Sequence, residues 1–181
     1  MCDFPFGMSL LEEGQKTVLV VEDSADDLFL IQKAVERAKC DLCFRYVRDG
    51  EEAIAYLQGA APYGDRGAHP FPAVVLLDLG MPKVDGFEVL GWIRSTRLCE
   101  DVEVFVVTGH DDPAKLERAK QAGADKIISK PVGLNKLRTI VELLEGVLRA
   151  AGAKTEAHSV AQRRSLSVSN SESDPAEAEG L

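Results

Sequence analysis

The sequence predicts an α/β fold, a doubly wound parallel sheet built from five strand–helix units. Two observations predict it. Short apolar runs rich in β-branched residues alternate with amphipathic stretches from Thr17 onward, and continuous runs of this length are typical of parallel strands that are covered on both faces. Strands that alternate with helices favour right-handed crossovers. The simplest architecture is a three-layer sandwich with strand order 2-1-3-4-5, although the pattern alone leaves the order open.

Each element is placed by its apolar spacing and its end signals. The expected strands are Thr17–Val21, Leu42–Val47, Ala73–Leu77, Val102–Val107 and Lys126–Ser129. The first expected helix follows Ser24, and the others cover Glu51–Leu57, Asp85–Ser95, Pro113–Ala122 and Leu134–Ala150. Ser24 suits an N-cap, with Asp26 and Asp27 in the first turn after it, and Gly123 is a helix stop.

Composition predicts one domain at residues 16–150, between an N-terminal extension at 1–15 and a polar tail at 151–181. The tail holds many Ser, Ala and Glu residues and few large apolar ones, so we expect it to be disordered. Residues 59–72 form a loop with three prolines that is longer than most loops in compact domains. We therefore interpret this loop as a candidate functional or docking feature.

Charge excludes several classes of partner. The chain has a net charge of −9 and a pI near 4.9, which argues against direct binding to nucleic acid or to an anionic membrane. No apolar run is long enough to span a bilayer, and residues 1–15 do not resemble a secretory signal. We expect a cytoplasmic protein whose four cysteines are thiols.

Polar residues that can carry chemistry follow four of the five expected strands. They are Glu22 and Asp23 after the first strand, Asp78 after the third, Thr108 after the fourth and Lys130 after the fifth. In open parallel sheets, ligands bind outside the carboxyl ends of the strands, where the strand order reverses. In the order 2-1-3-4-5 that point lies between the first and third strands. We therefore expect the three carboxylates to converge on one pocket that Thr108 and Lys130 also face.

This set of side chains suits phosphoryl transfer. Three carboxylates and one lysine leave about two negative charges, which a hard divalent cation such as Mg²⁺ would offset. With the metal present, Asp78 can act as a nucleophile and form an acyl phosphate. Lys130 would contact the added oxygens, and the Thr108 hydroxyl would bond one of them. Taken singly, each residue is more simply a turn, a cap or an exposed charge. Chance does not readily place five such residues on successive strand ends.

Four segments carry a resemblance to a known family. They are Val18–Ser24 (VLVVEDS), Leu76–Gly86 (LLDLGMPKVDG), Val106–Gly109 (VVTG) and Ser129–Pro131 (SKP). With these segments, the sequence from about residue 16 to residue 149 resembles the response-regulator receiver domain of two-component signalling, which has a flavodoxin-like fold. Together the segments are highly specific for that family.

The resemblance assigns roles to individual residues. It implies that Asp78 is the phosphoacceptor and that Glu22, Asp23 and the backbone carbonyl of Gly80 help to hold Mg²⁺. It also implies that Thr108 is the switch hydroxyl. Lys130 corresponds to the invariant lysine of the family, with a cis bond to Pro131.

Within that family, the 59–72 loop and the segment Asp49–Ala53 look like the phytochrome-associated single-domain regulators. This implies a sensor histidine kinase, such as a bacteriophytochrome, or a phosphotransfer protein as phosphodonor. Such regulators commonly form homodimers through the fourth helix, fifth strand and fifth helix. Ile127 departs from the family pattern, because an aromatic residue is usual there and its rotation reports phosphorylation. Gly80 replaces a frequent polar residue, which can alter the lifetime of the phosphate.

Other readings of the pocket are open at this point. A phosphatase of the haloacid dehalogenase type needs a second acid at position 80, where this chain has Gly80. A dinucleotide-binding enzyme needs a glycine loop after the first strand, where this chain has acids. A receiver-like module that is never phosphorylated and a mid-relay phosphate carrier are further alternatives. Because no output domain follows Ala150 in this sequence, we expect the signal to leave through the domain's own surface by a population shift.

Overall fold

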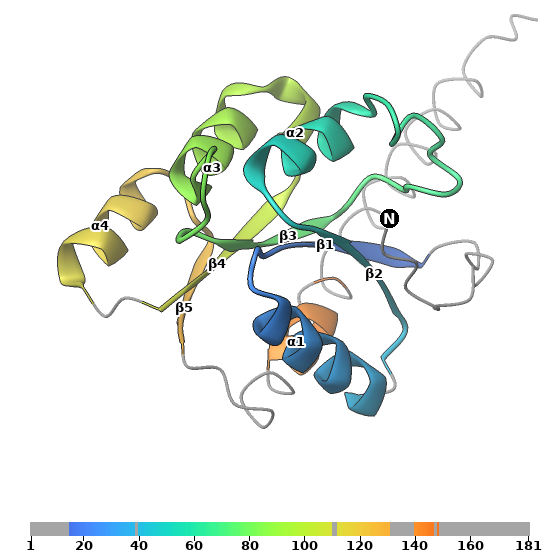
Figure 1. The fold of residues 1–181 in the computed structure, drawn as a ribbon, viewed down its shortest axis with the longest axis horizontal. Helices are drawn as coiled ribbons and strands as arrows, with labels where there is room; N and C mark the ends of the chain where they lie inside the picture. Colours follow the sequence, from blue (N-terminus) through green and yellow to red (C-terminus); the bar gives the residue numbers. More distant parts are fainter. Residues whose placement is uncertain (1–14, 39, 110–111, 131–139, 147, 149–181) are drawn as a thin grey trace, which may run out of the picture. The chain divides into compact units, whose positions relative to one another are not determined.

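The computed structural model describes residues 15–38, 40–109, 112–130, 140–146 and 148. Met1–Glu145 form one compact unit and Gly146–Leu181 a second, and only residues 146 and 148 of the second are described. The fold described below is that of the first unit (Figure 1). The predicted tail and nearly all of the predicted N-terminal extension lie outside the described residues, so these boundaries stay predictions.

The sheet has five strands in the order β2-β1-β3-β4-β5, which confirms the predicted topology. The strands are β1 (Lys16–Val21), β2 (Leu42–Val47), β3 (Val74–Asp78), β4 (Glu103–Thr108) and β5 (Lys126–Ser129). All four neighbouring pairs are parallel. Asp78 and Thr108 were expected just after their strands. They are instead the last residues of β3 and β4, because Asp78 is in register with Val107 and Thr108 with Ser129.

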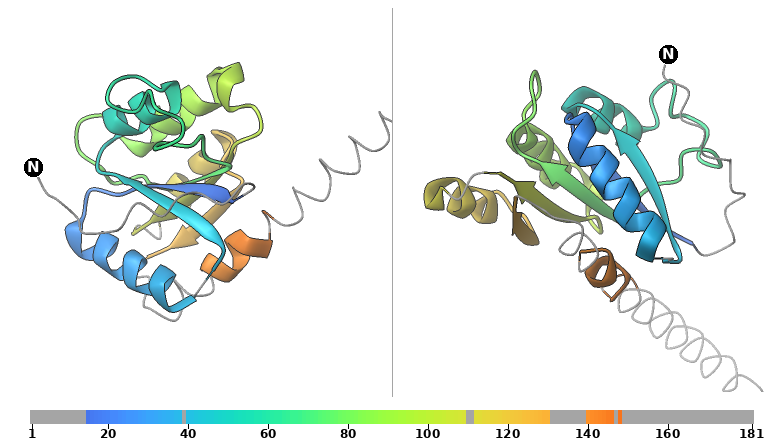
Figure 2. Two further views of the ribbon diagram at one scale, coloured as in Figure 1. Left: turned by 90° about the vertical axis from the view of Figure 1, so that its right-hand side faces the viewer. Right: turned by 60° about the horizontal axis from the view of Figure 1, so that its bottom comes forward.

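Helices cover both faces of the sheet, as the views in Figures 1 and 2 show. The helices are α1 (Ala25–Ala38), α2 (Gly50–Gln58), α3 (Gly86–Ser95) and α4 (Pro113–Gln121), with a 3₁₀ turn η1 (Arg97–Cys99). Residues 140–146 are also helical, inside the range predicted for the last helix. The helix α1 and residues 140–145 lie on one face, and α2 and α3 lie on the other. Among the described residues, no helix is long and apolar enough to cross a membrane.

The helix ends follow from local sequence. The Ser24 hydroxyl accepts a hydrogen bond from the backbone N–H of Asp27 at 3.3 Å, which fixes the first turn of α1. Asp85 and Glu88 form a reciprocal capping box at the start of α3. Gly123 has a φ of 95°, a left-handed conformation that ends the α4 segment as predicted.

Alternation along the central strands divides the core between the two faces. Leu19 and Val21 of β1 belong to a buried cluster with Leu90 and Ile93 of α3. The intervening residues Val18 and Val20 are also buried, as expected for a parallel strand that is covered on both faces. The other fully buried side chains of this cluster include Tyr56, Leu57, Val75, Leu77, Val89, Val104 and Val106. Tight packing on two faces leaves the strand ends as rigid platforms for polar side chains.

The 59–72 loop is tied to the end of α2 by Arg66. Its guanidinium donates to the carbonyl of Tyr56 at 2.8 Å and to that of Leu57 at 2.7 Å, two acceptors in the last turn of α2. The Tyr56 carbonyl also accepts from the Gly59 N–H at 3.1 Å. The rings of Tyr56, Tyr63 and His69 pack on one another with centroids 5.1 to 5.9 Å apart. The loop is therefore an organised part of the fold, and its docking role stays a prediction.

Gly86 allows α3 to begin directly against the end of β3. A Cβ built at this position would lie 2.6 Å from the Cα of Leu79 and would collide with the Asp78 carbonyl oxygen. Because these are backbone atoms, a side chain at Gly86 would force α3 away from the strand that carries Asp78. Gly91 lies in the same helix, is exposed, and has no atom within 4 Å of such a Cβ.

We expect Gly86→Ala to lower the free energy of unfolding by roughly 2 kcal/mol, the range of an overpacked core position. Gly91→Ala is the matched control and should raise it by about 0.5 to 1 kcal/mol, because alanine favours a helix interior. Urea denaturation followed by circular dichroism measures both. Equal effects of the two substitutions would contradict the close approach at Gly86.

Candidate functional site

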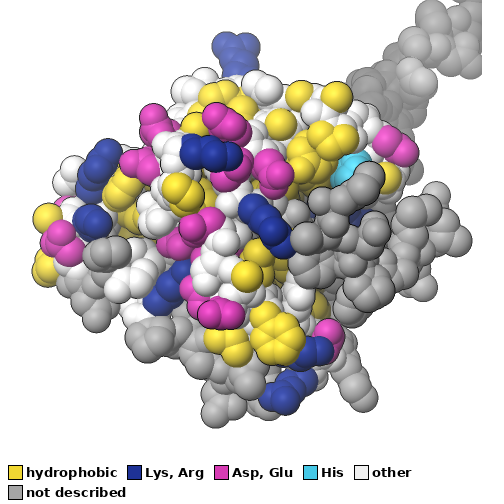
Figure 3. All heavy atoms as spheres, in the orientation of Figure 1, with side chains coloured by type: hydrophobic (Ala, Val, Ile, Leu, Met, Phe, Trp, Pro, Cys, Tyr) yellow, Lys and Arg dark blue, Asp and Glu magenta, His cyan; other side chains and the backbone are white. Residues whose placement is uncertain are grey.

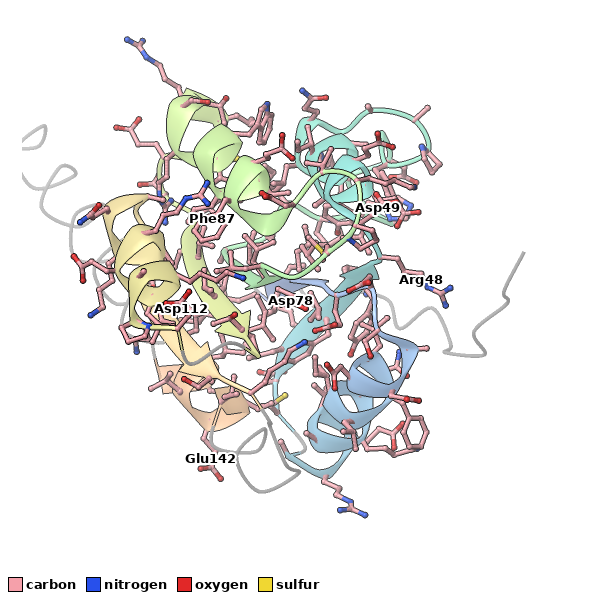
Figure 4. The ribbon with its side chains drawn as sticks, turned by 60° about the vertical axis from the view of Figure 1, so that its left-hand side comes forward. Arg48, Asp49, Asp78, Phe87, Asp112 and Glu142 are labelled. Carbon is pink, nitrogen blue, oxygen red and sulfur yellow. The ribbon has the colours of Figure 1, made fainter. Side chains whose placement is uncertain are left out.

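Three carboxylates meet at the carboxyl ends of β1 and β3, as the sequence predicted. Oxygen atoms of Glu22, Asp23 and Asp78 all lie within 4.8 Å of one another. Glu22 is 2% exposed and Asp78 is 8% exposed, whereas Asp23 is exposed. Figure 4 shows Asp78 at the middle of this edge of the sheet, between α1 on one face and α3 on the other.

Lys130 directs its ammonium group into this cluster from the end of β5. Its Nζ lies 2.7 Å from Glu22 Oε2, 2.7 Å from Asp27 Oδ2 and 3.0 Å from Asp78 Oδ2. The lysine side chain is 16% exposed, so these bonds are largely shielded from water. The contact with Asp27 was not predicted, because that residue was expected only in the first turn of a helix.

The two other predicted site residues are Thr108, in β4, and Gly80, two residues after the end of β3. Thr108 ends β4, is 1% exposed, and its carbonyl accepts a hydrogen bond from the Lys130 backbone N–H at 2.7 Å. The Gly80 N–H donates to Asp78 Oδ1 at 3.1 Å. A Cβ at Gly80 would lie 3.7 and 3.8 Å from the two Asp78 oxygens, so this position borders the carboxylate.

The cluster has unusual electrostatics. Burial raises the pKa of Glu22 to about 7, and the Asp78 charge adds to the rise, although the hydrogen bond and charge of Lys130 oppose it. Burial works to lower the pKa of Lys130, but hydrogen bonds to Asp27, Glu22 and Asp78 outweigh it and raise that pKa above its ordinary value. Lys130 is therefore held as an ammonium ion at neutral pH.

The arrangement has the donor set of a site for a hard cation. Four formal carboxylates, those of Glu22, Asp23, Asp27 and Asp78, face one ammonium group and leave an excess of negative charge. Carboxylate oxygens at close range favour Mg²⁺, Mn²⁺ or Ca²⁺ over softer metals. On the face drawn in Figure 3, acidic and basic side chains of the described residues are interspersed rather than gathered into a basic area.

Two predictions concern residues close to Lys130 in the sequence, Ile127 and Pro131. Ile127 is partly buried and packs against the core, so a branched aliphatic side chain occupies the position at which the family usually has an aromatic ring. Pro131, and with it the predicted cis bond, lies outside the described residues. The structure has a cis X–Pro bond at Ala61–Pro62.

Comparison with known proteins agrees with this geometry. Residues 18–142 match the response regulator receiver domain family. The probable methanogenesis regulatory protein FilR2 of Methanothrix harundinacea is 34% identical over 125 residues, which cover 69% of this chain and 78% of that protein. Response regulator Rcp1 of Synechocystis is 31% identical over 130 residues, which cover 72% of this chain and 86% of Rcp1.

Solved structures give the same result. The phosphorylated cyanobacterial phytochrome response regulator RcpA matches with a TM-score of 0.67 and 30% identity, over 76% of this chain and 96% of RcpA. The Mn²⁺-bound form of Rcp1 matches with a TM-score of 0.63 and 31% identity, over 72% of this chain and 91% of that chain. The chain therefore belongs to the response regulator receiver domain family and is a phosphoryl-accepting regulator of two-component signalling.

Proposed function

We propose that Asp78 is the residue that accepts the phosphoryl group. The observation that carries this assignment is the position of its carboxylate, which ends β3 at the centre of the acidic cluster with Lys130 Nζ 3.0 Å away. Asp78 is enclosed enough to exclude bulk water, yet it lies at the strand end where ligands reach open parallel sheets.

The proposal includes a divalent cation, Mg²⁺, held by the carboxylates of Glu22, Asp23 and Asp78 and by the Gly80 carbonyl. The close approach of three carboxylates supports it, because they repel one another and Lys130 supplies one positive charge against them. The Mn²⁺-bound form of Rcp1 is a related receiver with a metal of the same class. When bound, such an ion neutralises charge on the carboxylates and on the phosphoryl oxygens.

The reaction follows from the roles of the side chains. A carboxylate oxygen of Asp78 forms a bond to the phosphorus of a donor phosphohistidine, the phosphorus–nitrogen bond breaks, and its electron pair stays on the imidazole nitrogen, which takes up a proton. The product on this chain is an acyl phosphate. Lys130 donates hydrogen bonds to the phosphoryl oxygens, which are added to the Asp78 carboxyl group. In this proposal the Thr108 hydroxyl bonds another of these oxygens.

Turnover and output belong to the same proposal. The domain itself would catalyse both phosphoryl transfer and the later hydrolysis of the acyl phosphate. Receiver domains take phosphoryl groups from histidine kinases or phosphotransfer proteins. The likeness to a phytochrome response regulator supports a bacteriophytochrome-type kinase as donor. A cytoplasmic location fits the free thiols of Cys40, Cys43 and Cys99.

The output surface would be the side formed by α4, β5 and the last helix, through which a homodimer would form. Two described features support it. β5 is an edge strand whose four residues are all partly exposed, and α4 buries only Ala119 among its nine residues. Thr108 and Lys130 connect this side to Asp78, and the aliphatic Ile127 packs beneath it. Without an aromatic ring at this position, coupling would depend on movement of the β4–α4 and β5 ends.

The phosphoacceptor is tested with acetyl phosphate and Mg²⁺, followed by intact mass spectrometry. We expect wild-type protein to gain the mass of one phosphoryl group and Asp78→Asn to gain none, because an amide cannot form the acyl phosphate. Asp85→Asn is a matched control, since Asp85 caps α3 near the same loop, and it should still be phosphorylated. A wild-type protein that gains no phosphoryl group, or an Asp78→Asn variant that does, would refute the assignment.

Chelation tests the metal in the same assay. With excess EDTA in place of Mg²⁺, phosphorylation of the wild type should fall by at least about tenfold, because the charge of the carboxylates is no longer offset. Equal rates in Mg²⁺ and in EDTA would refute the role proposed for the metal, but not the assignment of Asp78 as phosphoacceptor.

Gly80 should control how fast water reaches the acyl phosphate. Gly80→Ala places a methyl group about as far from the Asp78 oxygens as ordinary van der Waals contact, so the variant should fold normally. We expect the half-life of the acyl phosphate to lengthen by about twofold to fivefold, a barrier change of under roughly 1 kcal/mol. Loss of the phosphoryl mass after removal of the donor measures it, and Gly91→Ala is the control. A half-life that matches the control would contradict the prediction.

A further inference from the structure

Lys130 has three hydrogen-bond donors on its ammonium group, and the structure gives each of them a carboxylate partner. The partners are Glu22, Asp78 and Asp27, which come from the end of β1, the end of β3 and the first turn of α1. In the function proposed above, the first two have other tasks, as metal ligand and as phosphoacceptor. Asp27 is the partner of Lys130 that neither task engages.

We propose that Asp27 is a positioning residue that holds the Lys130 ammonium over Asp78 while the phosphoryl group is bound. This inference rests on the proposed function of Asp78. When Asp78 becomes an acyl phosphate, its carboxyl group loses its negative charge and the added phosphoryl oxygens carry negative charge instead, and a cation shared with Glu22 weakens that residue as an acceptor. The Asp27–Lys130 bond is the contact that persists through these changes.

The position of Asp27 is itself fixed by the fold. Its backbone N–H donates to the Ser24 hydroxyl, and Leu28 and Ile31, which follow it in α1, are buried. Its Oδ2 lies 2.7 Å from Lys130 Nζ, as short as the Glu22 bond and shorter than the Asp78 bond.

Loss of this contact has a defined physical effect. A lysine has a flexible four-carbon stem. Without Asp27 the Lys130 ammonium keeps only the partners that metal binding and phosphorylation weaken, so it regains freedom to leave the pocket toward water. The phosphoryl group would then have to order Lys130 again on binding. Asp27→Ala should therefore weaken the phosphoryl state without altering the residues that contact phosphorus.

The test uses beryllofluoride as a phosphoryl mimic in saturating Mg²⁺, with ¹⁹F NMR as readout of affinity. We expect Asp27→Ala to weaken binding by about tenfold, within the range of a partly exposed hydrogen bond to a charged group. Asp26→Ala is the matched control, because Asp26 is exposed in the same helical turn and carries the same charge. It should bind within about twofold of wild type, since the helix dipole effect is common to both.

A double-mutant cycle isolates the role of Lys130. If Asp27 acts through this lysine, Asp27→Ala should change affinity by less than about twofold in a Lys130→Ala background. The proposal is overturned if Asp27→Ala matches Asp26→Ala, if it tightens binding, or if its effect is the same with and without Lys130. In each of these cases wild type still binds the mimic and Asp78→Asn does not. A wild-type protein that binds no mimic would instead count against the function proposed for Asp78.

Discussion

The constraint on which this structure depends is the gathering of four carboxylates around one ammonium group at the ends of parallel strands. Like charges at such distances repel, and a buried carboxylate loses hydration, which is why the pKa of Glu22 rises to about 7. Lys130 meets three of the four carboxylates at 2.7 to 3.0 Å and offsets part of the excess charge. The site therefore favours the binding of a cation, or of a group that accepts hydrogen bonds from Lys130.

The fold supports this arrangement by making the strand ends immobile. β1, β3 and β4 are covered on both sides, and their interior positions are almost fully buried. Gly86 lets α3 pack against the backbone of Asp78 and Leu79. The backbone at the end of β3 therefore has little room to shift under the repulsion between the carboxylates. Core packing on both faces of the sheet thus stabilises a polar cluster that would not assemble on a flexible loop.

Sequence patterns predicted the element types but left the strand order open, with 2-1-3-4-5 as the simplest architecture. From that order they predicted the convergence of Glu22, Asp23, Asp78 and Lys130, because strand ends in a parallel sheet share one edge. They did not predict Asp27 as a partner of Lys130. The signal was present: Asp27 precedes Ile31 and Ala34 by four and seven residues, which places it at the start of the buried stripe of α1. However, the favourable interaction of an acid with the first turn of a helix was already a sufficient explanation for Asp27. The direction of its side chain depends on how α1 sits on the sheet, which periodicity does not encode.

Ile127 and Gly80 show how one pocket can serve different signalling requirements. Both have smaller side chains than the residues usual at these positions. The Gly80 backbone N–H donates to Asp78 Oδ1, whereas Ile127 packs against the core. At Gly80 the absent side chain leaves the Asp78 carboxylate open on one side, and the effect that we propose for this residue on phosphate lifetime rests on that opening. At Ile127 an aliphatic side chain stands in place of an aromatic ring, so the core beside β4 and β5 lacks a large side chain that could rotate there. The charges of the cluster come from other residues at the strand ends, and neither Gly80 nor Ile127 has a side chain that carries charge. Phosphate lifetime and output can therefore vary while the carboxylates and Lys130 stay unchanged.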